Sequence, residues 1–401
     1  MLEFDIAQAR LAESAPLPQT TETCLLHEAL GRVLAENLLA THDLPPADNS
    51  AMDGYAIRHA DCQAGKPLPV QQRCFAGQAP EPLQPGKAIR LFTGSLIPQG
   101  ADTVVMQEDC TESDGQVTID TLPHRGSHVR KRGEDIAQGR TLLTSGTYLQ
   151  ASHITLLASQ GVERVTVYSR LKIGILTTGD ELVAPGKPLG PAQIYNSNGP
   201  MLAALATGMG AQVVHVLHAL DTHESLREAF TRLIGDCDLI LTVGGVSVGE
   251  KDLVKATIEQ MGGGVDLWRV RMKPGKPVAL AQAHGKPIVC LPGNPVSAYV
   301  VYTLLVSPMV RAMQGRAVKL PPISYAQLDA DKAFNETREE FLRVRAAAQA
   351  DGSMRLHPYA QQSSGVMSSL PWSTGLARIP ADTLVGRGDI VAYYDYAHWQ
   401  A

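Results

Sequence analysis

The stretch from about residue 171 to 314 constrains the fold most, because apolar runs alternate there with stretches of helical periodicity. The predicted strands are 172–176, 213–217, 239–243, 278–280 and 288–291. The predicted helices are 199–207, 223–234, 253–260 and 295–313. This alternation predicts βαβ units, and therefore a parallel sheet with helices on both faces. Ligands bind such sheets beyond the carboxyl ends of the strands.

The remaining sequence predicts further modules. Helical spacing from 5 to 39 gives way to short alternating runs rich in Gly and Pro from 41 to 139. Helical periodicity returns at 152–160 and ends at Gly161, and short alternating strands fill 322–401. We therefore predict a multidomain α/β plus β protein. Its parts are an elongated helical domain (1–40 and 140–169), an inserted small β domain (41–139), a three-layer α/β parallel-sheet domain (170–318) and a C-terminal β-barrel (319–401).

Composition excludes several classes of protein. The formal net charge of the 401 residues is −5, which does not favour a nucleic-acid partner. The six cysteines form no CxxC pair, and the N-terminus lacks the basic and apolar regions of a secretion signal. The most apolar stretch, 296–310, is interrupted by Ser, Thr and Pro and is too short to span a bilayer. We expect a soluble, cytoplasmic protein without a membrane partner.

Two predicted strands end in turns that combine glycine, hydroxyl and carboxylate groups. One turn carries Gly179 and Glu181, and the other, from Gly244 to Asp252, also carries Gly245 and Ser247. Glycine lets backbone N–H groups approach an oxyanion, and a hydroxyl adds a hydrogen bond. The carboxylates suit a phosphate ligand only if a divalent cation lies between them. Ordinary βα turns with a helix cap would explain either motif by itself.

Two further turns carry cationic and anion-binding features. Lys273 and Lys276 lie on a proline-bounded loop before a predicted strand, which would hold both ammonium groups in place. Asn294 precedes Pro295 and Ser297 at the start of a predicted helix, where it can cap the helix and exposed N–H groups can bind an anion. A solvated basic turn and a structural cap are the alternatives, but four such motifs in one domain favour a ligand site.

The first half of the chain supplies candidate carboxylates. Asp53 lies in the polar loop 48–56, and Thr93 follows a predicted strand. The run 128–135 mixes three cations with two acids, the second of which is Asp135. Taken singly, these segments are typical of turns and of a solvated charge run.

Together these motifs resemble the molybdopterin molybdenumtransferases, the bacterial molybdenum insertases that are similar to the gephyrin E domain. The resemblance covers essentially the whole chain, and seven motifs occur in the family's order. They are 48–56, 92–94, 132–135, 178–181, 244–249, 273–277 and 291–297.

The resemblance implies a homodimer whose cleft is shared between subunits. It also implies a reaction in which adenylylated molybdopterin and molybdate give molybdenum cofactor and AMP with a divalent cation, usually Mg²⁺. The family's catalytic positions fall on Asp53, Thr93, Asp135, Glu181, Asp221 and Asp252. Its substrate-binding positions fall on Gly244, Gly245, Ser247, Arg269, Lys273, Lys276, Asn294, Ser297, Arg343 and Ser368. Arg269 stands where some relatives carry lysine, so an anion contact there keeps its charge and changes its geometry.

Glu181 and Asp252, with Asp53 from the partner subunit, are the predicted Mg²⁺ ligands. A molybdopterin adenylyltransferase is a candidate partner protein. Two alternatives remain: another enzyme on the same α/β module, such as an adenylyltransferase or a nucleotide amidohydrolase, and a non-catalytic scaffold. The 48–56 loop together with a C-terminal barrel favours the insertase over another enzyme on the α/β module. The retained carboxylates and lysines favour the insertase over a scaffold.

Overall fold

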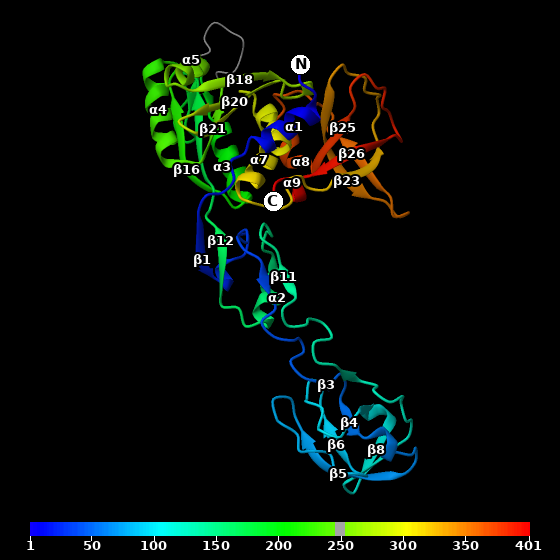
Figure 1. Ribbon diagram of the computed structural model, residues 1–401. Coiled ribbons are helices and arrows are strands. Elements are labelled where there is room, and N and C mark those ends of the chain that lie inside the picture. The colour runs from blue at the N-terminus through cyan, green and yellow to red at the C-terminus, as the bar shows by residue number, and fades with distance from the viewer. Residues whose placement is uncertain (245–252) are drawn as a thin grey trace. The chain divides into compact units, whose positions relative to one another are not determined.

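A six-stranded mixed sheet organises the larger part of the structure, a computed structural model that describes residues 1–244 and 253–401 (Figure 1). Its strand order is β16 (Gln212–Ala219), β13 (Lys172–Thr178), β17 (Leu239–Val243), β21 (Lys286–Leu291), β20 (Pro277–Ala283) and β18 (Gly264–Arg269). The first four strands are parallel, as predicted. The parallel prediction is wrong for β20, which pairs antiparallel with β21 and β18. Only His284 and Gly285 separate β20 from β21, too few residues for a crossover.

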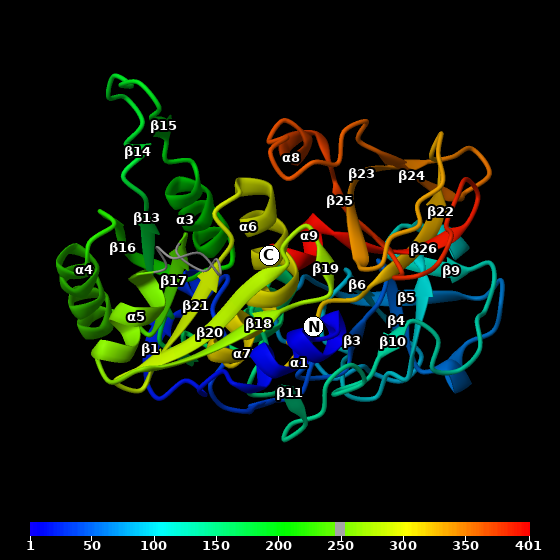
Figure 2. The same cartoon turned by 90° about the horizontal axis from the view of Figure 1, so that it is seen from above.

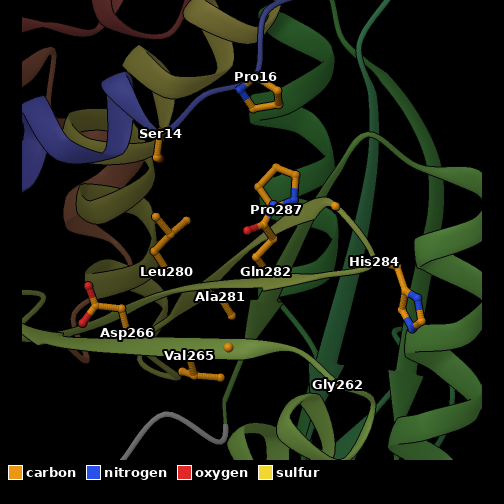
Figure 3. Close-up of a pocket in the computed structure, with 12 residues that line it drawn as sticks. Ser14, Pro16, Gly262, Val265, Asp266, Leu280, Ala281, Gln282, His284 and Pro287 are labelled. Atoms are coloured by element: carbon orange, nitrogen blue, oxygen red, sulfur yellow. The ribbon is translucent and has the colours of Figure 1, made fainter.

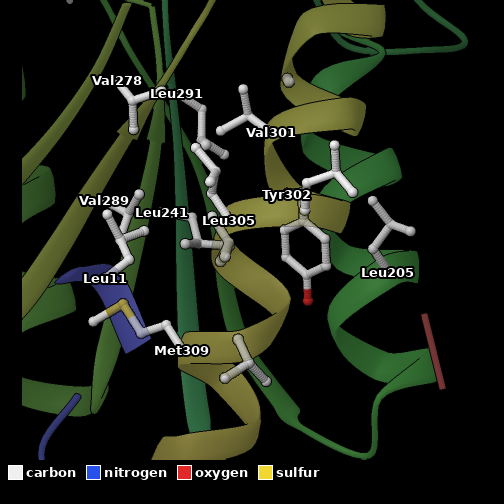
Figure 4. Packing of buried hydrophobic residues seen from close by; sticks show 14 of the residues in the cluster. Leu11, Leu205, Leu241, Val278, Val289, Leu291, Val301, Tyr302, Leu305 and Met309 are labelled. Atoms are coloured by element: carbon white, nitrogen blue, oxygen red, sulfur yellow. The ribbon is translucent and has the colours of Figure 1, made fainter. Parts of the chain in front are cut away.

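Helices cover both faces of this sheet, as the alternation predicts (Figures 1 and 2). One face packs against α4 (His223–Asp236) and α5 (Leu253–Gln260). The other packs against α1 (Phe4–Glu13), α3 (Asn198–Gly208), α6 (Pro295–Val301), η4 (Tyr302–Val306) and α7 (Ser307–Met313). Successive residues of β17 point to opposite faces of the sheet. Leu239 and Leu241 pack on the face that α1 covers, and Ile240 packs on the face that α4 covers. Figure 4 shows side chains from α1, α3, the strands and the α6–α7 helix interdigitating.

The helix Pro295–Met313 has 19 residues, which confirms the helix predicted at 295–313. Among the described residues it is the one helix with the length and hydropathy of a membrane span. However, 94% of that span is buried inside the protein. The apolar residues therefore serve the core against which α1 and the sheet pack.

The N-terminal segment departs from the helical prediction. Only α1 is helical as expected, and it packs into the α/β core. After Pro16 and Pro18 the chain forms β1 (Thr21–Leu25), which pairs antiparallel with β12 (Arg164–Tyr168), then η1 (Leu26–Glu28). The helical prediction for 14–39 is wrong because prolines interrupt the segment and tertiary strand pairing overrides the spacing of its apolar residues. The predicted helix at 152–160 is confirmed as α2 (Ala151–Ser159), followed by Gly161 at φ +70°.

The chain divides into two units, and the smaller comprises Asn37–Thr144 with Thr155–Glu163. Its six-stranded sheet has the order β7 (Thr103–Met106), β4 (Gly54–Ile57), β6 (Ala88–Leu91), β5 (Pro67–Cys74), β9 (Gln116–Ile119) and β8 (Cys110–Ser113). Two-stranded pairs join β3 (Asn49–Ser50) to β10 (Val129–Arg130) and β2 (Leu38–Leu39) to β11 (Thr141–Leu143). The short turns η2 (His59–Asp61) and η3 (Gln107–Asp109) complete it. The strands predicted near 88–92 and 116–119 are confirmed as β6 and β9.

The C-terminal residues of the larger unit form the predicted barrel. It closes through β23 (Glu339–Ala348), β24 (Met354–Pro358), β22 (Ser324–Leu328), β26 (Ile390–Asp395) and β25 (Gly375–Ile379), because β25 pairs back onto β23. The helices α8 (Ser369–Trp372) and α9 (Tyr396–Trp399) flank it. The short strand β19 (Met272–Lys273) pairs in parallel with β23. This pairing attaches the predicted basic loop to the barrel.

Candidate functional site

The carboxyl ends of the parallel strands form the floor of the candidate site. Gly244 follows β17 with φ +98°, and a Cβ atom there would lie 2.7 Å from Thr178 Oγ1 at the end of β13. Its N–H reaches the carbonyl of Leu291 at the end of β21, at 3.4 Å. Both the left-handed backbone and the close approach of β13 require glycine at this position. The turns after these strands are therefore brought together at one edge.

The basic loop between β19 and β20 lies against the helix that follows β21. Gly275 has φ +107°, and a Cβ atom there would lie 2.5 Å from Val301 Cγ2 of α6. The loop therefore needs glycine to pack against the helix while Lys273 and Lys276 flank it. Val270 N–H donates to the Lys276 carbonyl at 2.9 Å, which fixes the far end of the loop.

These turns and one barrel loop line a cavity of about 620 Å³. Five predicted residues meet in its lining: Gly244, Lys273, Lys276, Asn294 and Ser297. The barrel contributes four more that the sequence analysis missed: Arg338, Gln362, Ser363 and Ser364. The polar run 362–364 was visible in the sequence, but nothing in its spacing indicated which side chains reach the strand ends. The cavity therefore combines three cationic side chains with hydroxyls and amides.

Lys273 is held by two carboxylates. Its Nζ lies 2.6 Å from Glu336 Oε1 and 3.0 Å from Glu340 Oε1. Burial lowers the pKa of the Lys273 ammonium, but the hydrogen bonds and charges of both glutamates outweigh it and raise the pKa overall. The hydrogen bond from Lys273 lowers the pKa of Glu336 in return. Lys276 is exposed and forms no ion pair within residues 1–244 and 253–401.

Arg343 supports the barrel loop from beneath. Its side chain is fully buried, and its guanidinium donates to the carbonyls of Gln362 and Ser363, each at 3.0 Å. Nε donates to Ser369 Oγ at 3.1 Å, and a further bond reaches the Gln361 carbonyl at 3.3 Å. Arg343 does not belong to the cavity lining. The structure therefore places it where it orders the loop that carries Ser363 and Ser364.

Asn294 precedes α6, but its side chain does not cap the helix as the sequence analysis expects. Its Nδ2 donates instead to Ser364 Oγ at 3.2 Å. This hydrogen bond joins the strand end to the barrel loop across the cavity. Pro295 occupies the first turn of α6, as predicted. The Asn294 side chain therefore accepts from no N–H group of that turn, although the Asn294 carbonyl accepts from the Ala298 N–H at 2.9 Å.

Other predicted residues of this unit lie outside the cavity lining. Glu181 follows β13, and its carboxylate oxygens lie close to Gly179. Asp221 follows β16, and its N–H donates to Asp180 Oδ1 at 3.1 Å, so acidic residues gather at this end of the sheet. Arg269 is exposed at the end of β18, where its carbonyl accepts from Leu2 N–H at 2.8 Å. Ser368 is exposed and bonds the Tyr359 hydroxyl at 3.0 Å.

In the smaller unit, Asp53 and Thr93 form a pair. Asp53 Oδ1 accepts from the Thr93 N–H at 2.7 Å and from the Thr93 hydroxyl at 2.8 Å. These hydrogen bonds lower the pKa of the Asp53 carboxyl. The next residue, Gly54, lies so close to the neighbouring strand that a Cβ atom would be 1.9 Å from the Val105 carbonyl oxygen. The structure therefore supplies an ionised carboxylate in a fixed orientation.

Two cations of the charge run 128–135 form ion pairs with carboxylates outside the run. Lys131 Nζ lies 2.8 Å from Asp48 Oδ2, and Arg132 Nε lies 2.5 Å from Asp43 Oδ2. Asp135 is exposed, and its N–H donates to the Leu44 carbonyl at 3.1 Å. The predicted residues Gly245, Ser247 and Asp252 lie outside the described residues.

A second cavity, of about 720 Å³, has a different chemistry (Figure 3). It lies between Ser14 and Pro16 of the N-terminal segment and the strands β18, β20 and β21, where Leu280 and Pro287 contribute apolar surface. Asp266 lies in its lining, and among residues 1–244 and 253–401 no lysine or arginine does. The cationic cavity at the strand ends is therefore the one that suits an oxyanion.

Comparison with known proteins gives a consistent set of relatives. Three family models match successive segments: the MoeA N-terminal region (domain I and II) at residues 2–161, a probable molybdopterin binding domain at 174–312, and the MoeA C-terminal region (domain IV) at 325–396. The molybdopterin molybdenumtransferase of Haemophilus influenzae is 38% identical over 374 residues, 92% of each chain. That of a Nostoc species is 36% identical over 381 residues, 92% of this chain and 87% of the relative.

Solved structures agree with these matches. The molybdopterin biosynthesis moeA protein of Pyrococcus horikoshii OT3 is 28% identical, with a TM-score of 0.83 over 98% of this chain and 100% of that chain. The similarity therefore extends through all the matched regions and includes the barrel that lines the cavity.

Proposed function

The chain belongs to the MoeA family of molybdopterin molybdenumtransferases, and on that premise we propose that it inserts molybdenum from molybdate into adenylylated molybdopterin and releases AMP. It is an enzyme of molybdenum cofactor biosynthesis. The observation that carries the proposed chemistry is the cavity at the strand ends, in which Lys273, Lys276 and Arg338 surround hydroxyl and amide donors.

The charges of the cavity suit these substrates. Molybdate is a dianion, and the pterin substrate carries a pyrophosphate and two thiolates. Lys276 and Arg338 would offset negative charge and orient an oxyanion, with Ser297 and Ser364 as neutral donors. Holding the oxyanion beside the dithiolene would supply much of the rate enhancement, because the reacting atoms then need little reorientation.

A divalent cation fits the acidic end of the sheet. The described residues contain no group of three or more candidate metal ligands, but Mg²⁺ needs only one or two carboxylates when substrate phosphates and waters complete its shell. Glu181 has this chemistry at the end of β13, and we propose that it holds Mg²⁺ with Asp252 and with Asp53 from a partner subunit. When bound, Mg²⁺ would offset charge on the pyrophosphate.

The family also suggests an oligomeric state, a cellular location and a partner protein. We propose a cytoplasmic homodimer in which Asp53, held by Thr93, faces the substrate cavity of the other subunit. Arg343 would act as a positioning residue through the barrel loop, and a molybdopterin adenylyltransferase would supply the substrate. We propose catalytic roles for Asp135 and Asp221 and a substrate contact for Arg269.

One assay tests the proposal. Purified protein is incubated with adenylylated molybdopterin, molybdate and Mg²⁺, and AMP and molybdenum cofactor are measured. We expect both products in equal amounts, with cofactor formation dependent on molybdate. Production of adenylate from ATP and molybdopterin, without cofactor, would identify an adenylyltransferase instead.

A variant tests the metal assignment separately. Glu181→Gln should raise the Mg²⁺ concentration needed for half-maximal AMP release, because one anionic ligand is lost. Unchanged AMP release at limiting Mg²⁺ would remove Glu181 from the metal site and leave the rest of the proposal standing.

A further inference from the structure

The ammonium of Lys273 reaches the oxyanion cavity already bound to two carboxylates. It has three N–H donors, of which Glu336 Oε1 and Glu340 Oε1 accept at 2.6 Å and 3.0 Å. One cation with two carboxylates carries a net charge of −1. Within residues 1–244 and 253–401, neither glutamate has an ion pair to another cation. A dianion that approaches Lys273 would therefore meet repulsion as well as attraction.

The two glutamates differ in their access to water. The side chain of Glu340 is 6% exposed, on β23 directly opposite Lys273 in the strand register. The side chain of Glu336 is 37% exposed and lies before β23. The Glu336 backbone is fixed, since its carbonyl accepts from Asp382 N–H at 2.7 Å. Glu336 can therefore turn its carboxylate into solvent without moving the chain, whereas Glu340 has no such route.

We propose that Glu336 is an internal competitor of the oxyanion: the substrate anion displaces the Glu336 carboxylate from Lys273, while Glu340 keeps the ammonium in place. This inference rests on the proposed function, because it assigns the cavity to an oxyanion. It divides the two carboxylates into an exchangeable partner and a permanent one. Exchange keeps two anionic groups beside Lys273, so the half-buried cation is never left without a counterion.

The exchange has a measurable consequence for affinity. Removing the charge of Glu336 removes a competitor, so molybdate should bind more tightly. Exposed ion pairs are weak, which limits the gain to roughly three- to fivefold in Kd. Removing the charge of Glu340 leaves the competitor in place and loosens Lys273, so it should give no gain. A purely long-range charge effect predicts at least as large a gain for the buried Glu340.

The test is calorimetric titration of the full-length protein with sodium molybdate, for the natural chain, Glu336→Gln and Glu340→Gln. Asp351→Asn is the matched control, because Asp351 is an exposed barrel carboxylate that accepts only from its own turn, at Ser353. We expect tighter binding for Glu336→Gln alone. The KM for molybdate should fall for the same variant in the insertion assay. Glu336→Asp, which restores the charge on a shorter side chain, should return part of the competition.

Three results would overturn the inference. They are an unchanged Kd for Glu336→Gln, an equal gain for Glu340→Gln, and no molybdate binding by either the natural chain or Glu336→Gln. The insertion assay keeps the proposed function separate. Cofactor formation with an unchanged Kd for Glu336→Gln contradicts the exchange alone, whereas tighter binding in Glu336→Gln without cofactor formation contradicts the proposed reaction alone.

Discussion

The two sides of the oxyanion cavity are held in place by different interactions. On the sheet side, Gly244 and Gly275 have positive φ angles and pack directly against Thr178 and Val301, so backbone geometry fixes the turns. On the barrel side, long side chains do this: Arg343 gathers the carbonyls of the loop, and Glu340 holds Lys273. On the sheet side, substitutions at the glycines should therefore be the most harmful. On the barrel side, substitutions of the long charged side chains should be the most harmful.

The largest expected effect is on the barrel side. Arg343→Lys removes the fork that donates to the Gln362 and Ser363 carbonyls and leaves a buried cation with fewer acceptors, which should cost about 3 kcal/mol. Urea unfolding of the natural chain and the variant measures this. Arg345→Lys is the control, because Arg345 lies two residues further along β23, is exposed, and donates to the Trp372 carbonyl. Equal losses of unfolding free energy in both variants would mean that the hydrogen bonds of Arg343 do not stabilise the loop.

The next effect tests the sheet side. Gly275→Ala places a Cβ atom 2.5 Å from Val301 Cγ2 at a strained φ, which should cost about 2 kcal/mol and raise the KM for molybdate. Gly388→Ala is the control, because Gly388 also has a large positive φ, at +89°, but its Cβ would meet nothing within 4 Å, so the change should cost about 1 kcal/mol. The difference between the two Tm shifts isolates the contact with α6. No difference would show that the helix does not support the basic loop.

A smaller effect separates charge from position. Lys273→Gln should lose about 1 kcal/mol, because Glu340 remains buried without its cation, and should also bind molybdate more weakly. Lys276→Gln should weaken binding alone, since Lys276 is exposed. If Lys276→Gln destabilises the protein as much as Lys273→Gln, the ion pairs of Lys273 do not contribute to stability as described.

The stability difference due to Lys273 should depend on pH with a definite sign. The pKa of Glu336 is lowered, so its contribution is present above the unfolded value of about 4.3 and is lost as pH falls through the folded value. The pKa of Lys273 is raised, so its contribution is present below about 10.4 and is lost as pH rises through the folded value. The difference in Tm between the natural chain and Lys273→Gln should be constant from about pH 5 to 10. A difference that grows below pH 4 would contradict the ion pair.

The same contrast explains how much the sequence could predict. Strand ends, glycine turns and the basic loop follow from local pattern, so Gly244, Lys273, Lys276, Asn294 and Ser297 were identified and meet in one cavity. Arg338 and the 362–364 loop reach that cavity only because β19 pairs with β23, which no local pattern encodes.

Two errors in the predicted fold have a similar cause. The helical spacing of residues 14–39 was overridden by pairing of β1 with β12, more than a hundred residues away. The direction of β20 depended on a turn of two residues, which periodicity alone does not register. The barrel and the four parallel strands were predictable because their patterns are repeated over several segments.

The smallest expected effect concerns the hydrogen bond that joins the two sides. Ser364→Ala removes the acceptor of the exposed hydrogen bond from Asn294 Nδ2. The free energy of unfolding should therefore fall by about 0.5 kcal/mol, and the KM for molybdate should rise about twofold. Ser368→Ala removes a hydroxyl that bonds Tyr359 outside the cavity lining, so it should leave the KM unchanged. A larger effect for Ser368→Ala would mean that the substrate meets the barrel at Ser368, where the family resemblance places a contact. The cavity between the strand ends and the 362–364 loop would then be the wrong description of the oxyanion site.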